Sequence, residues 1–281
     1  MSNLLRGLTV ALAIFATVAD ADAQDWRTLT NRRQRAGEQE LRVRVRFGMG
    51  KIEVGAAESG TLYRSTIRYD ADTFRPLHDY KAGLLTVGID GGGAHVWTGE
   101  IDDDAGRLEL ALGPNVPLDL DFEMGAVDAD IELGGLRIRR AAISTGASDT
   151  RLRFSQQNPE RLEGLTVKAG AAAMQIIGLG NANAEQLSVS GGAGEIVLDF
   201  SGAWRRDLAC KVEMGLGALT LRIPRGVGLR VDKDTFLVSF DSQELVKRGD
   251  AYYSLDWEEA EHHLTLDISG ALGSVDVHWL N

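Results

Sequence analysis

The chain has 281 residues, with 41 acidic and 30 basic side chains and a net charge of −11 at pH 7. This balance argues against nucleic acid as a partner, because binding phosphates requires clustered cations. Glycine is frequent at 33 residues and proline is scarce at five, while a single cysteine leaves no possibility of an internal disulfide.

The first 23 residues have the three parts of a secretory signal peptide. Arg6 is positively charged, residues 8–18 form a short apolar run, and Ala21-Asp22-Ala23 is a small-residue cleavage site. No later stretch reaches the ~20 apolar residues that a membrane-spanning helix needs. We therefore expect an exported chain, in the periplasm or outside the cell, with no membrane span after signal removal.

The region between the signal and residue 117 has no regular period. Residues 24–38 are polar and irregular, and we interpret them as a flexible leader or a short cap. Residues 39–117 contain unevenly spaced strand patterns, of which residues 41–47 alternate most cleanly. No helix pattern follows the glycines at 91–93, so they do not predict a phosphate site.

A repeat centred on glycine organises the rest of the chain. Apolar residues fall five and three positions before each centre, and four, six and eight positions after it. In the most regular part, successive centres are 21, 24, 22 and 23 residues apart. The centres are Gly48, Gly125, Gly146, Gly170, Gly192 and Gly215, with Ala271 in the same place in a last copy.

A period of this length predicts stacked β rungs. Glycine suits the corner between two strand segments, because it accepts positive φ and lets backbones approach closely. The predicted fold is therefore all-β: a parallel β-solenoid over 118–281, with 39–117 as a β-rich cap. The repeat is interrupted at 232–265, and we expect little helix beyond the signal segment.

Stacking the units in register predicts which outward side chains are neighbours. Three pairs of opposite charge are expected on adjacent rungs: Asp130 with Arg151, Glu132 with Arg153, and Asp199 with Arg222. The same register places Cys210 and Trp279 in inward slots of the core. A buried thiol of this kind is structural rather than reactive.

Candidate chemistry is limited to two acidic rows, one of Asp119, Asp121 and Glu123 and one of Asp128, Asp130 and Glu132. They could bind calcium or serve a polysaccharide lyase. We favour solubilising ladders instead, because arginines nearby in the sequence compete for the carboxylates. His262 and His263 are adjacent and would point to opposite faces of a strand, so they lack metal-ligand spacing.

No nucleophile elbow, zinc motif or Walker loop occurs in the sequence. We therefore assign no catalytic, cofactor-binding or metal-ligating residue and expect no cofactor; the repeat glycines are structural. A set of aromatic residues could stack on sugars if its members were exposed together. It comprises Trp97, Trp204, Trp257, Trp279, Tyr252 and Tyr253, of which Trp279 occupies an inward slot and is assigned to the core.

The segment 45–55, VRFGMGKIEVG, resembles the opening of the toast-rack N-terminal domain, and residues 63–69 and 74–76 continue the likeness. Residues 253–256 and 268–277 resemble the end of the LiaF-like domain, itself called a toast rack. The resemblance implies a β-solenoid of the bacterial cell envelope, with a toast-rack section at 39–117 and a LiaF-like solenoid at 118–281. It carries over no catalytic residues.

Three functions follow as hypotheses. The first is an exported, non-catalytic envelope module that binds a protein or glycan partner, as an adhesin does; an exposed apolar or aromatic patch along one face would favour it. The second is a regulator or accessory of envelope-stress response. LiaF proteins have that role, but they carry transmembrane helices where this chain has a signal peptide. The third is a glycan lyase or hydrolase, which would need clustered carboxylates and an arginine in a groove.

Overall fold

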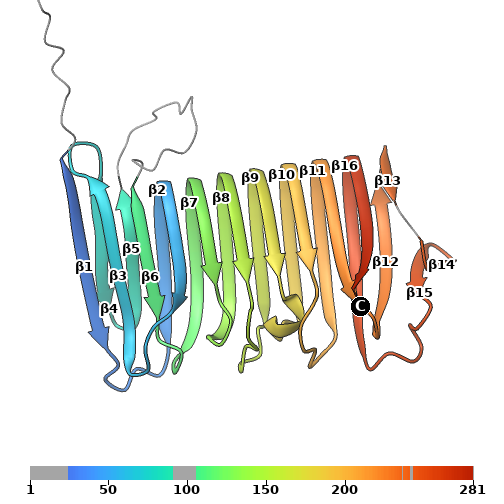
Figure 1. Cartoon of the computed structure of the whole chain (residues 1–281), viewed down its shortest axis with the longest axis horizontal. Helices are drawn as coiled ribbons and strands as arrows, with labels where there is room; N and C mark the ends of the chain where they lie inside the picture. The colour runs from blue at the N-terminus through green and yellow to red at the C-terminus, as the bar shows by residue number, and fades with distance from the viewer. Residues whose placement is uncertain (1–24, 91–105, 236, 241–242, 281) are drawn as a thin grey trace, which may run out of the picture.

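The computed structural model describes residues 25–90, 106–235, 237–240 and 243–280. These residues form an elongated stack of β-strands (Figure 1), so the predicted all-β solenoid is confirmed. The only helical element in the described ranges is the four-residue 3-10 turn η1, Leu179–Ala182. The signal peptide predicted at 1–23 and the side chain of Trp97 lie outside the described residues.

Seven long strands form the rungs, and neighbouring rungs pair in parallel along most of their length. Each rung rises from the lower edge of Figure 1, turns at the upper edge and returns, so that corners line one edge and loops the other. The rungs are β2 (Leu41–Ala56), β7 (Pro117–Glu132), β8 (Arg137–Arg153), β9 (Gly164–Ile177), β10 (Gln186–Asp199), β11 (Leu208–Pro224) and β16 (His262–Leu280).

The core lies between the two halves of the rungs. Val43 and Val45 before the first corner are buried, and so are Ile52 and Val54 after it. Alternate residues of a strand face opposite sides. The inward residues lie an odd number of positions before the corner and an even number after it. The corner therefore reverses the alternation. Both halves therefore turn their apolar side chains inward.

The repeat glycines lie directly on one another in register, as predicted. A Cβ added at a corner would meet the carbonyl oxygen of the preceding corner glycine, at 2.1 Å for Gly125, 3.3 Å for Gly146, 2.7 Å for Gly170, and 2.5 Å for Gly192 and Gly215. Positive φ is not the reason for glycine here, which corrects the sequence expectation, because none of these residues has a positive φ. The reason is the space between stacked backbones.

A second glycine column, which the sequence analysis did not single out, stands two residues after four of the corners. Its members are Gly50, Gly194, Gly217 and Gly273, with φ values of 120°, 132°, 145° and 149°. A Cβ on Gly217 would lie 1.8 Å from the carbonyl oxygen of Gly194. Here both the left-handed φ and the close approach exclude a side chain. The recurring Gly-x-Gly at 48–50, 192–194 and 215–217 was the available signal.

The N-terminal end is closed by five shorter strands. They are β1 (Trp26–Gln34), β3 (Thr61–Asp70), β4 (Arg75–Lys81), β5 (Leu84–Asp90) and β6 (Arg107–Leu112). Strands β5 and β6 continue the parallel stacking on the two halves of β2, whereas β4, β3 and β1 are antiparallel to their neighbours. The sheet continues from β2 to β7, so the domain boundary expected after residue 117 corresponds to no break in it and stays a prediction.

The interpretation of 24–38 as a flexible leader is wrong for Trp26–Gln34, because these residues pair with β3 along their whole length. The polar composition that suggested a leader is that of an edge strand. Arg32 and Arg33 are exposed there, and charged side chains on an outermost strand discourage pairing with other chains.

The C-terminal end departs from sequence order. Strand β16 pairs with β11 on one side. On its other side it pairs with β12 (Val227–Thr235) and β13 (Val238–Phe240), one after the other. The hairpin of β14 (Leu245–Arg248) and β15 (Ala251–Ser254) covers the far side of β12. The interruption predicted at 232–265 is therefore an end cap, and the last copy of the repeat returns to fill the place beside β11.

Buried asparagines satisfy the backbone in the loops opposite the corners. The Asn158 side chain is fully buried. Its amide donates to the carbonyls of Ile138 and Ala182 at 2.8 and 3.1 Å, and its oxygen accepts from the N–H groups of Ile138 and Glu160, both at 3.1 Å. One side chain thus joins three successive loops.

Replacing Gly125 by Ala should destabilise the fold by about 1–3 kcal/mol, because the new methyl group would overpack against the Gly48 carbonyl. Gly146→Ala is the matched control on the same column and should cost less, because its Cβ would lie 3.3 Å from the Gly125 carbonyl oxygen and needs a shift of only a few tenths of an ångström. Urea unfolding monitored by far-ultraviolet circular dichroism gives both values. Equal losses at the two corners would contradict the packing explanation.

Asn158→Ala should cost about 2–5 kcal/mol, because it leaves several buried backbone groups without partners. Asn115→Ala serves as the control, since Asn115 is exposed and bonds only the Ser59 hydroxyl among described contacts; it should change stability by less than ~0.5 kcal/mol. Thermal unfolding by calorimetry distinguishes them. A small effect at Asn158 would show that water replaces its amide.

Candidate functional site

A shallow groove follows the glycine corners along the solenoid. Two hollows of about 630 and 620 Å³ make it up, and both are lined by Ser144 and Thr145 of β8, so they form one continuous depression. The first hollow extends over β9, β10, β11 and β16, and the second over β2 and β7. We call this depression the corner groove. It crosses all seven rungs and is open to solvent.

The groove has a backbone floor and a polar wall. Its floor is made by the corner glycines, because they carry no side chains above the stacked chains. Its wall is the column two residues before each corner: Arg46, Glu123, Ser144, Lys168, Ser190, Glu213 and Ser269. This column consists of four charged and three hydroxyl side chains, so the groove can form hydrogen bonds along its whole length.

Three of the four charged groups of the wall, those of Arg46, Glu123 and Glu213, form ion pairs within the protein. Arg46 lies 3.2 Å from Glu123, and Lys211 lies 2.6 Å from Glu213. The hydrogen bond from Lys211 holds the pKa of the Glu213 carboxyl below its ordinary value. The Glu213 carboxylate is therefore poorly suited to donating a proton to a substrate at neutral pH.

An apolar ridge stands beside the groove, one residue after each corner. Its members are Met49, Ala126, Ala147, Ala171, Ala193, Leu216 and Leu272, without a polar residue among them. The members from Ala147 onward are exposed. This ridge is the exposed apolar patch that the sequence analysis set as the sign of a binding module.

The three predicted charge pairs are neighbours in the structure. Arg153 binds two carboxylates of the preceding rung, Asp130 at 2.7 Å and Glu132 at 3.4 Å, and Arg222 lies 3.8 Å from Asp199. The stacking register is therefore confirmed.

The acidic rows are largely neutralised by arginines. Asp121 lies 3.3 Å from Arg44, and Asp119 lies 3.3 Å from Arg139. Among the described residues, no group of three or more histidine, cysteine, aspartate or glutamate side chains could hold a metal ion. The rows therefore resemble the ladders of alternating charge that the sequence analysis favoured.

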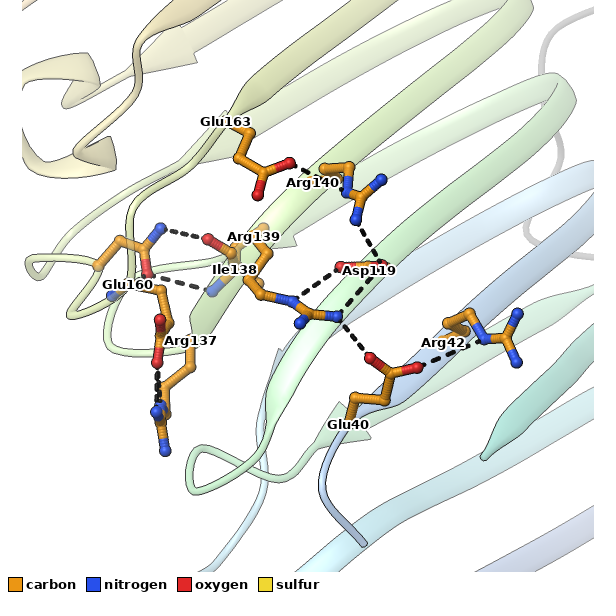
Figure 2. Close-up of polar contacts among 10 residues, drawn as sticks. Glu40, Arg42, Asp119, Arg137, Ile138, Arg139, Arg140, Glu160 and Glu163 are labelled. Atoms are coloured by element: carbon orange, nitrogen blue, oxygen red, sulfur yellow. Dashed lines mark hydrogen bonds and ion pairs between the residues drawn. The ribbon is translucent and has the colours of Figure 1, made fainter. Parts of the chain in front are cut away.

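A β-bulge concentrates charge at the start of β8. Leu118 lies opposite Ile138 while Asp119 lies opposite Arg140, so Arg139 is an extra residue in the ladder. Such a bulge turns two consecutive side chains to the same face. Figure 2 shows Arg139 and Arg140 both directed to Asp119, with Arg139 also 2.7 Å from Glu40.

The network of Figure 2 continues to both sides of the bulge. Arg140 contacts Glu163 at 3.4 Å, Arg42 contacts Glu40 at 4.0 Å, and Arg137 pairs with Glu160. Positive and negative groups are balanced across four rungs. The cluster therefore ties the rungs together and leaves no uncompensated charge to attract an ion.

The remaining candidates of the sequence lie apart from the groove. Cys210 is buried in the core, as predicted, and burial raises the pKa of its thiol. Trp279 is half-buried against the core, with the Arg225 guanidinium 5.2 Å from its ring centre. His263 is anchored by the Trp257 ring at 4.5 Å and the Trp257 carbonyl at 3.0 Å, so it forms no metal site with His262.

The aromatic candidates that the structure describes are divided between the C-terminal cap and a loop. Tyr253 packs edge-on against Trp257 at 5.3 Å in the C-terminal cap. Trp204 lies in the loop after β10 and donates its indole N–H to the Phe200 carbonyl at 3.0 Å. The groove and the ridge, which the sequence analysis did not identify as sites, are the extended surface features instead. The sequence pattern that could have predicted the ridge is the apolar residue one position after each corner.

The chain matches the family described as the N-terminal domain of toast_rack, DUF2154, over residues 20–177 and 162–222. It therefore belongs to the toast-rack family, as the resemblance of its N-terminal motif indicated. The match continues past residue 117 into the regular rungs. No curated protein matches the sequence.

The solved structures that are similar to this chain include two bacterial proteins. A candidate cell adhesion protein from Clostridium sporogenes has a TM-score of 0.48 and 14% identity, covering 91% of this chain and 100% of its own. A candidate adhesin from Bacteroides fragilis has a TM-score of 0.43 and 9% identity, covering 89% and 97%. In the described part of the chain, no helix has the length and apolar character to cross a membrane.

Replacing Arg139 by Gln should raise the pKa of Glu40. The hydrogen bond from Arg139 holds the pKa of this carboxyl below its ordinary value. A lowered folded-state pKa stabilises the protein above the unfolded-state pKa, and this stabilisation is lost as the pH falls through the folded-state pKa. The variant should therefore lose less stability on acidification than the wild type does.

Carboxyl carbon chemical shifts followed by NMR against pH measure this change. Glu185 is an internal control, because its lowered pKa depends on Arg161 and should not move. An unchanged Glu40 titration in the variant would contradict the assigned contact.

Proposed function

We propose that the protein is an exported, non-catalytic module of the cell envelope that binds a protein or glycan partner along its glycine corners. The observation that carries this proposal is the corner groove, which crosses all seven rungs without interruption and is flanked by the apolar ridge. A long, open surface of repeated contacts suits an extended or broad partner. It does not enclose a small molecule, as most small-ligand pockets do.

The charges support binding over catalysis. A lyase or hydrolase would need a free carboxylate in the groove beside an arginine or a proton donor. The carboxylates that line the groove are those of Glu123, Glu213 and Asp90. Glu123 and Glu213 are each paired with a cation of the protein, and Asp90 also has an interaction partner. In the described part of the chain no feature favours a LiaF-like regulator over a binding module, so we propose the module alone.

Ser144→Trp should weaken binding to envelope material, because the indole would fill the place where the two hollows meet. Ala142→Trp is the matched control: Ala142 is also exposed, on the same strand and face, but it lies outside the groove. The measurement is binding of the labelled chain 25–281 to purified envelopes of the source bacterium. We expect at least a tenfold loss for Ser144→Trp and less than a twofold change for the control.

Treating the envelopes beforehand identifies the partner class. Loss of binding after protease digestion would indicate a protein, and loss after periodate oxidation would indicate a glycan. Equal binding by the two tryptophan variants, or no saturable binding by the wild-type chain, would refute the groove as the site.

A further inference from the structure

Lys168 is an exposed cation in the middle of the corner groove. Of the four charged side chains in the wall, it alone forms no ion pair within the described part of the chain, whereas Arg46, Glu123 and Glu213 are paired. Its own strand, β9, contains no other charged residue. The ammonium group of Lys168 is therefore available to a partner.

Hydroxyl groups flank this cation on both neighbouring rungs. Lys168 lies directly between Ser144 of β8 and Ser190 of β10 in the parallel register, and neighbouring strands are ~4.8 Å apart. All three side chains line the same hollow of about 630 Å³, whose floor is backbone. A cation with a hydroxyl on either side is suited to a single anionic group, which accepts hydrogen bonds from all three.

The nearest carboxylates of the wall leave this cation largely free. Glu123 and Glu213 lie two rungs from Lys168 on either side, which corresponds to ~9.6 Å between the strands. Lys211 is the main cause of the lowered pKa of Glu213, and Lys168 makes the smallest contribution. The attraction between Lys168 and these carboxylates is weak, because each of them already has a closer cation.

Two further acidic groups of these rungs lie on the far side of the ridge. Asp149 and Glu195 stand three residues after the corners of β8 and β10. Together with the net charge of −11 they oppose a dense polyanion. They do not prevent contact of an isolated anionic group with Lys168, because physiological salt screens exposed charges over ~8 Å. The ligand expected here therefore carries anionic groups spaced among neutral ones.

An apolar surface lies across the glycine floor from this cation. Over the same three rungs the ridge consists of Ala147, Ala171 and Ala193, which are exposed and adjacent in register. A sugar ring has hydroxyl groups at its edge and apolar C–H groups on its faces, so it can contact the serines and the alanines together. An extended peptide binds through its main chain to a free strand edge, but β8, β9 and β10 are each paired on both sides. The hollow therefore suits a glycan better than a peptide.

We propose that Lys168, Ser144 and Ser190 bind one anionic group, a carboxylate or a phosphate, of an envelope glycan. This inference rests on the function proposed for the corner groove and adds the chemical class of its ligand. Lysine is a compact point charge that pairs with either anion. The two sources of negative charge are therefore separated by experiment.

The test uses the chain 25–281 and protease-digested envelopes of the source bacterium. Lys168→Gln should bind about tenfold more weakly than the wild type, because it loses a charged hydrogen bond. Lys168→Arg keeps the charge and should bind within about threefold of the wild type. Lys81→Gln is the matched control, since it removes the same charge from an exposed position of β4 outside the groove. The control should bind as the wild type does, and all three variants should unfold at the wild-type temperature.

Two chemical treatments of the digested envelopes identify the anion. Carbodiimide activation followed by borohydride reduction converts carboxylates to alcohols, and cold hydrofluoric acid removes phosphodiesters. The treatment that removes the anionic group should lower wild-type binding to the level of Lys168→Gln and leave binding of that variant unchanged. No effect of either treatment, or an equal loss in Lys168→Arg and Lys168→Gln, would overturn the proposal.

The Ser144→Trp variant separates this inference from the proposed function. Wild-type binding by Lys168→Gln together with a loss in Ser144→Trp would overturn the inference and leave the groove as the binding site. Wild-type binding by both variants would refute the groove itself. A dependence on Lys168 that is seen with intact envelopes and lost after protease digestion would overturn the inference in favour of an acidic protein.

Discussion

Contact between stacked backbones at the corners is the constraint on which the rest of this structure depends. Parallel pairing sets the distance between rungs, and from Gly125 to Gly215 a Cβ on each corner glycine would lie 2.1–3.3 Å from the carbonyl oxygen of the preceding one. Larger side chains would therefore press the rungs apart, and the last rung has the small residue Ala271 at this place. The corner column fixes the register, and the register determines which side chains are buried and which charges become neighbours.

The same constraint produces the candidate binding surface. Since the corner glycines have no side chains, their column forms the floor of the groove, with the polar wall on one side and the apolar ridge on the other. The close packing of the corner backbones thus determines both the stability of the stack and the shape of this surface. The bulge at Arg139 interrupts the regular register between β7 and β8. It lets two arginines of one rung reach carboxylates on the rungs beside it, and these ion pairs join the rungs.

The two ends of the solenoid must cover strands whose backbone groups would otherwise be unpaired. At the N-terminus the pairing changes from parallel to antiparallel, and the outermost strand, β1, carries exposed arginines. At the C-terminus β16 fills the place between β11 and β12, so the chain closes its core only when its last strand is in position. Both ends interrupt the repeat for the same physical reason: an unpaired edge would bind other chains.

The sequence by itself determined the rungs, their register and the inward residues, because these depend on local alternation and on a glycine at a fixed interval. It also determined the pairs Asp130–Arg151, Glu132–Arg153 and Asp199–Arg222, which follow from register alone. It did not reveal β1, since an edge strand rich in arginine has the composition of a leader. Only the tertiary structure decided the insertion of β16 and the bulge at Arg139. Each of these depends on contacts between residues distant in sequence, and no local period records such contacts.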